Sequence, residues 1–144
     1  MMTAPFGAVR TLVNKVYDNV WTDWYSAIPS VSKATVETLC SDGSAAYSHA
    51  QNRIIIPIPS GNLDDPDILD EKGWPVWKID LIHEMLHEWQ KKGSCIPSPE
   101  ADALHAKYRP GSCGDGHGSD FFQAVIEKAP YFQMAPEELV GRIG

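Results

Sequence analysis

Residues 75–93 have the sequence PVWKIDLIHEMLHEWQKKG, and this stretch decides the interpretation of the rest of the chain. Its apolar residues recur at intervals of three and four, which predicts an amphipathic helix with one buried face. Pro75 suits the first turn of a helix, while Lys91, Lys92 and Gly93 are typical of a helix end. The apolar positions of this helix are Val76, Ile79, Ile82, Met85, Leu86 and Trp89.

The middle of this helix carries the pattern His83-Glu84-Met85-Leu86-His87. Residues four apart lie on the same helix face, so His83 and His87 can both bind one metal ion. Glu84 follows the first ligand and is placed to take a proton from a water molecule at the metal. Zn²⁺ suits two imidazoles in this spacing. The alternative interpretation is a solvated helix face with two ordinary histidines.

A catalytic zinc site needs a third protein ligand and an open fourth position. We predict that His117 is this ligand, because Gly116 and Gly118 on either side let the backbone bend closely around a metal. The alternatives for the third ligand are Glu100, Asp102, His105, Asp120 and Cys40. We interpret Cys40 as a buried cysteine. Cys113 is four residues before His117, and as a fourth ligand it would make the site structural.

These motifs resemble the SprT-like zinc metalloproteases, which include the eukaryotic protease Spartan. The pattern His83-Glu84-Met85-Leu86-His87 followed by Asp115-Gly116-His117-Gly118-Ser119-Asp120-Phe121 is similar to the HExxH helix and the downstream HG segment of that family. The likeness covers roughly residues 5–130. It implies a minimal zincin fold, a zinc ion on His83, His87 and His117, and peptide-bond hydrolysis with Glu84 as general base.

The sequence differs from this family in two ways. The interval from His87 to His117 is longer than usual, so we expect residues 94–112 to form an insertion. The paired CxxC motifs of the zinc ribbon that many members carry at the C-terminus are missing. We therefore transfer the metal site and the proteolytic chemistry from the resemblance, but not the role of the family at DNA–protein crosslinks.

The remaining segments predict an α+β fold. An amphipathic helix is expected at the N-terminus, followed by two strands, a loop, the HExxH helix and C-terminal helices. Prolines 57 and 59 cannot donate ladder hydrogen bonds, so we predict that the isoleucine-rich second strand lies at a sheet edge and binds an extended substrate peptide. Ser119 is expected to cap a helix. The predicted strands are 34–40 and 47–59, and the predicted loop is 60–75. The predicted helices are 3–28, 75–92, 99–108 and 119–129.

Length and composition limit the class of protein. With 144 residues, 43% of them hydrophobic, the chain fits one globular domain over residues 1–144. A net charge of −7 with scattered basic residues argues against nonspecific phosphate binding as the main activity. We expect no signal peptide, because the first residues show no basic region followed by an apolar run, and no transmembrane segment, because no stretch is apolar for 18 residues. Three cysteines at irregular spacing suit a reducing compartment, so we expect a cytoplasmic location.

Together these observations predict a zinc metalloendopeptidase whose partner is a protein or peptide substrate. Two rival functions stay open at this point. One is a noncatalytic zinc-stabilised interaction module, and the other is a metal hydrolase that acts on a nonpeptide amide.

Overall fold

The computed structural model describes residues 6–40, 43–58, 73–111 and 116–143. Their fold is α+β, as predicted, with five α-helices, one short 3₁₀ helix and three strands in the described ranges. The residues group into two compact units, Met1–Glu84 and Met85–Gly144. The boundary falls inside one continuous helix, α2 (Val76–Lys92), which contributes to both units.

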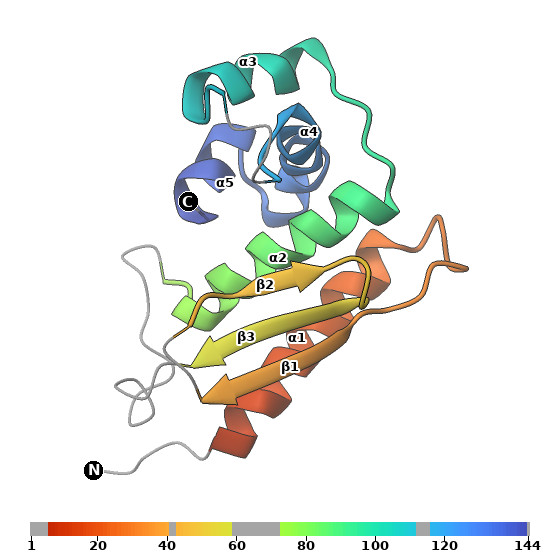
Figure 1. The fold of residues 1–144 in the computed structure, drawn as a ribbon, viewed down its shortest axis with the longest axis vertical. Helices are drawn as coiled ribbons and strands as arrows, with labels where there is room; N and C mark the ends of the chain where they lie inside the picture. The colour runs from red at the N-terminus through yellow and green to blue at the C-terminus, as the bar shows by residue number, and fades with distance from the viewer. Residues whose placement is uncertain (1–5, 41–42, 59–72, 112–115, 144) are drawn as a thin grey trace. The chain divides into compact units, whose positions relative to one another are not determined.

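The first unit contains a small mixed sheet. Its elements are α1 (Phe6–Trp24), β1 (Thr35–Cys40), β2 (Ala46–Ser48), β3 (Arg53–Ile58) and the first half of α2. The strand order is β1-β3-β2, so β3 is the central strand (Figure 1). β1 runs parallel to β3 along its whole length, with Thr35 opposite Arg53, and β2 runs antiparallel to it.

The prediction that the strand over residues 47–59 lies at a sheet edge is wrong, because β3 pairs on both sides, and the predicted addition of a substrate peptide to this strand is wrong for the same reason. The proline argument failed for a local reason. β2 is short and pairs only with Arg53, Ile54 and Ile55, so Pro57 lies beyond the end of that ladder. The predicted single strand over residues 47–59 is also divided by a turn at residues 49–52, where Asn52 adopts a left-handed φ of 50°.

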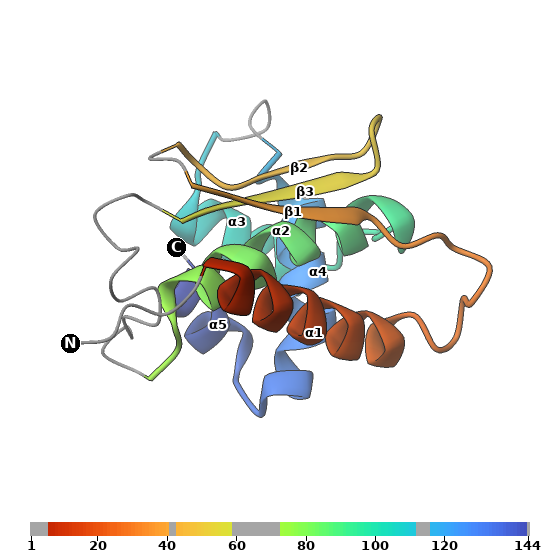
Figure 2. The same cartoon turned by 90° about the horizontal axis from the view of Figure 1, so that it is seen from below.

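The core of the first unit lies between the sheet and α1. Ile54, Ile56 and Ile58 alternate along β3 and are at most 3% exposed, as expected for side chains on one covered face. α1 lies along a face of the sheet (Figure 2) and buries one side of the helix. The Tyr17 hydroxyl of α1 accepts a hydrogen bond of 2.8 Å from the backbone N–H of Ala34, just before β1. The buried side of α1 comprises Val9, Val13, Tyr17, Val20 and Trp24.

The second unit is helical. It contains the end of α2, α3 (Pro99–Tyr108), α4 (Ser119–Lys128), η2 (Ala129–Phe132) and α5 (Pro136–Ile143). The predicted helices over 99–108 and after Pro136 are confirmed. α3 lies within residues 94–112 and is capped by Ser98, whose hydroxyl accepts a hydrogen bond from the N–H of Ala101. The N-cap of α4 is Gly118 rather than Ser119.

α2 ends where the sequence predicts. Gly93 is required there, because a Cβ at this position would lie 2.7 Å from both the carbonyl oxygen and the ring of Trp89. Most of the predicted loop 60–75 lies outside the described residues. In the described ranges, no helix combines the length and the apolar character that crossing a membrane requires.

Candidate metal centre

His83 and His87 lie one turn apart on α2, which is unbroken from Val76 to Lys92. The opposite side of this helix is fully buried through Leu81, Ile82, Met85 and Leu86, while both histidines are only partly buried. Because the apolar residues fix the rotation of the helix, the two imidazoles project together from its other face.

His117 joins these two histidines from the segment before α4. Gly116 has a φ of +84°, in the left-handed region that favours glycine, and this turn presents the next residue to α2. The Nε2 atoms of His87 and His117 are 3.3 Å apart. Ligating atoms of His83, His87 and His117 all lie within 4.8 Å of one another.

These distances fit one metal ion. Two nitrogens held tetrahedrally at the zinc–nitrogen distance are about 3.3–3.4 Å apart, which is the separation between His87 and His117. In the part of the chain that the structure describes, His83, His87 and His117 are the His, Cys, Asp or Glu residues that gather three ligating atoms within 4.8 Å of one another. The triad is therefore a group of three histidines that could hold one metal ion.

Gln90 orients the second histidine. Its Oε1 lies 3.0 Å from Nδ1 of His87, and its Nε2 donates a hydrogen bond of 3.2 Å to the carbonyl oxygen of Gly116. With the amide oxygen as acceptor, the proton of His87 is on Nδ1, which leaves the lone pair of Nε2 for a metal. The same side chain, only 5% exposed, links α2 to the turn that carries His117.

Phe121 of α4 supports the same two histidines. Its ring centroid lies 4.5 Å from that of His87 and 4.8 Å from that of His117. Phe121 is 3% exposed, so its ring holds both imidazoles from the protein side and excludes water from that direction.

Glu84 lies in the first unit, on α2 next to His83, and is 7% exposed. The pKa of its carboxyl is raised to about 7, mainly by burial and further by repulsion from Asp80, while a hydrogen bond from the backbone of Tyr47 opposes the rise. Burial also raises the pKa of Asp80, four residues earlier, to about 6. No salt bridge among the described residues includes either carboxylate. The hydrogen bond also brings β2, an edge strand, next to Glu84.

The alternative third ligands do not belong to the triad. Glu100 and Asp102 are exposed on α3, and Asp120 accepts a hydrogen bond from the N–H of Phe121 at the start of α4. His105 lies 3.4 Å from the hydroxyl of Ser119 through its Nδ1. Cys40 is exposed at the end of β1, so its interpretation as a buried cysteine is wrong. The possible fourth ligand Cys113 lies outside the described residues.

Sequence reasoning missed the residues that surround the histidines. Gln90 is three positions after His87, and Asp80 is four positions before Glu84, so helical spacing places each on the same face as its neighbour. That spacing was available as a signal. In the sequence Phe121 is only the last residue of the downstream motif, and nothing there indicates that its ring contacts two imidazoles.

Comparisons of the chain with protein-family models, with curated proteins and with solved structures found no match.

Proposed function

We propose that this protein is a zinc-dependent peptidase in which His83, His87 and His117 hold the metal and Glu84 is the general base. The observation that carries the proposal is the convergence of three imidazoles within 4.8 Å, with a buried carboxylate adjacent to one of them in the sequence. Three neutral nitrogen ligands leave a tetrahedral metal with one open position, which is the composition of a catalytic rather than a structural site.

The residues of the site fit zinc. The 3.3 Å separation of the two Nε2 atoms matches tetrahedral coordination, and Gln90 holds His87 in the tautomer that a metal ligand needs. A zinc ion held there would polarise the carbonyl of a scissile peptide bond and lower the pKa of a bound water molecule.

Glu84 moves the proton in the proposed reaction. Its carboxylate accepts a proton from the attacking water while the water oxygen bonds to the carbonyl carbon. The same carboxyl then gives this proton to the peptide nitrogen as the carbon–nitrogen bond breaks. Water is thereby added across the bond, and the products are a carboxylic acid and an amine. The backbone of Tyr47 keeps the carboxylate in place during both transfers.

The resemblance of the two motifs to the SprT-like metalloproteases supports this proposal. The family pattern assigns ligand roles to the same three histidines and the base role to the same glutamate. We propose a protein or peptide as the substrate, without a role at DNA.

The proposal is tested with Glu84→Gln and His87→Ala in parallel. Glu84→Gln keeps the size of the side chain and leaves the three ligands intact, so the variant should bind one zinc ion per chain. Its cleavage of an unfolded protein such as casein should fall about 10²–10⁴-fold, because the amide cannot accept a proton. His87→Ala should lose both zinc and cleavage. Glu100→Gln is the matched control, because this glutamate is exposed on α3.

Two results would contradict the proposal. Near wild-type cleavage by Glu84→Gln would exclude Glu84 as the base. A wild-type protein that holds zinc firmly but cleaves neither proteins nor small amides would indicate the interaction module instead. Cleavage of small amides alone would indicate the nonpeptide hydrolase.

A further inference from the structure

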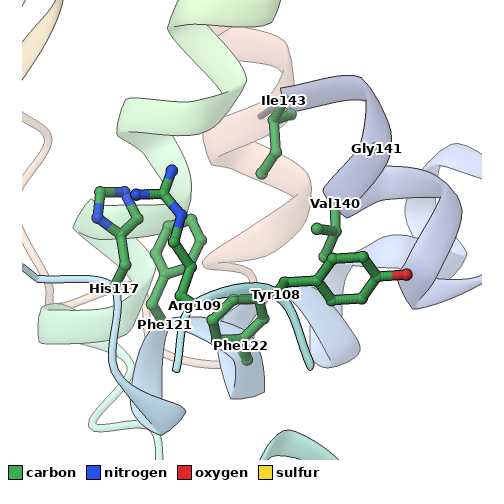
Figure 3. A pocket seen from close by; sticks show the side chains of 8 residues that line it. All are labelled: Tyr108, Arg109, His117, Phe121, Phe122, Val140, Gly141 and Ile143. Carbon is green, nitrogen blue, oxygen red and sulfur yellow. The ribbon is translucent and has the colours of Figure 1, made fainter. Parts of the chain in front are cut away.

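A cavity of about 250 Å³ inside the second unit is lined in part by His117. Figure 3 shows Arg109 and His117 on one side of it and Val140 and Ile143 of α5 on the other. Most of its wall is apolar, and Phe122 is only 2% exposed. The lining residues are Tyr108, Arg109, His117, Phe121, Phe122, Val140, Gly141 and Ile143.

The cavity and the metal centre share a wall. His117 is at once a member of the triad and a lining residue of the cavity. Phe121 contacts the rings of His87 and His117 and also faces the cavity. A group that binds in this cavity therefore lies beside His117, one of the three candidate metal ligands.

We propose that this cavity binds a large uncharged side chain of the substrate, aromatic or branched aliphatic, next to the scissile bond. The inference rests on the proposed function and adds a substrate preference to it. The size of the cavity supports this occupant, because an apolar cavity of about 150 Å³ already holds benzene. A cavity of 250 Å³ accommodates a benzyl or isobutyl group with room to spare.

Arg109 disfavours positively charged side chains in the cavity. Its guanidinium lines the cavity on the same side as His117 (Figure 3), so a lysine or arginine side chain of a substrate would meet a like charge there. A small side chain such as that of alanine would leave most of the apolar wall uncovered. The substrate bonds that this site selects are therefore those flanked by Phe, Trp or Leu.

The test compares two zinc-binding probes on the zinc-loaded protein by calorimetry. Acetohydroxamic acid presents a methyl group and 3-phenylpropanohydroxamic acid presents a phenyl-bearing chain to the space beside the metal. We expect the phenyl probe to bind roughly 10- to 100-fold more tightly, as full burial of a phenylalanine-sized group predicts. Gly141→Leu places a larger side chain at the wall of the cavity, within α5, and should reduce the ratio to less than about threefold.

The matched control is Ala106→Leu, an equally large addition at an exposed position of α3 outside the cavity, which should keep the wild-type ratio. Zinc stoichiometry and circular dichroism establish that each variant is folded. A ratio near one in the wild type, or an unchanged ratio in folded Gly141→Leu, would overturn the inference while casein cleavage upheld the proposed function. The expected affinity ratios in a protein that cleaves no substrate would support the cavity as a binding site for an apolar group and contradict the proposed function. Failure of both probes to bind the zinc-loaded protein would overturn both.

Discussion

Gln90→Leu removes the side chain that orients His87 and changes little else. Leucine has a similar size and an equally high helix propensity, so α2 should stay intact. The substitution removes both the acceptor 3.0 Å from Nδ1 of His87 and the donor to the carbonyl oxygen of Gly116. Without the first contact, the Nδ1 proton of His87 loses its acceptor, and the tautomer with the proton on Nε2 is no longer disfavoured. Without the second, the turn before His117 loses its link to α2.

The expected loss of zinc affinity follows from these two contacts. Removal of a hydrogen-bond partner behind a metal-ligating histidine costs roughly 10- to 100-fold in affinity, which is about 1.4–2.8 kcal/mol. Because two of the three ligands depend on Gln90, we expect the upper half of this range. Gln90→Glu keeps an acceptor for Nδ1 of His87 but loses the donor to the carbonyl oxygen of Gly116, so its zinc affinity should fall between those of the wild type and Gln90→Leu.

The measurement is a competition titration of zinc against a chromogenic chelator at constant pH and ionic strength. Gln123→Leu is the matched control, because Gln123 also makes two hydrogen bonds, one from the N–H of Ser98 and one to Glu127. This variant should lose stability but not zinc affinity. If Gln90→Leu binds zinc as tightly as Gln123→Leu, the idea that Gln90 positions His87 and His117 is refuted.

Two further predictions concern Gly116 and Glu84. Gly116→Ala should weaken zinc binding, because a residue with a Cβ is strained by about 1–2 kcal/mol at a φ of +84° and the backbone change moves His117. The control is Gly111→Ala, at a φ of +80° in open space. It should lower the stability by a similar amount but leave the zinc affinity unchanged in the same titration. Glu84→Gln should stabilise the metal-free protein by about 1–3 kcal/mol, because it removes a buried charge that has no ion pair among the described residues. Glu88→Gln should destabilise the protein, because it removes the 2.6 Å ion pair with the partly buried Lys92. Denaturant unfolding in the presence of a chelator measures both effects, and a stability loss in Glu84→Gln would contradict the second prediction.

The helical part of the fold was predictable because its signals are local. The spacing of Ile79, Ile82, Met85 and Leu86, and the ending at Gly93, depend on residues within a few turns of one another. The same holds for His83 and His87, whose relation follows from helix geometry alone. His117 was predicted as a candidate from its flanking glycines, and the structure places it with the other two.

The order of the strands was not predictable from such signals. Whether Pro57 excludes a central position depends on where the neighbouring strand ends, and the length of β2 depends on a turn at residues 49–52 that no glycine or proline marks. Pairing between β1 and β3 is parallel and connects residues 18 positions apart, as in the pair Thr35 and Arg53. The preference of proline for edge strands concerns single residues, so it does not predict which strands pair.

Two glutamates one turn apart on α2 provide an argument for catalysis over a purely structural metal site. Glu88 is fully buried and is neutralised by Lys92 at 2.6 Å, which is how a structural carboxylate is accommodated in a protein interior. Glu84 is almost as buried, yet it has no ion pair among the described residues, and Asp80 adds a second negative charge on the same face. A metal site that only holds the fold together requires its ligands and nothing more. A buried carboxylate that directly follows one of those ligands in the sequence, at a cost in free energy, is explained when it has a proton to move, and this is our reason for proposing a peptidase rather than an interaction module.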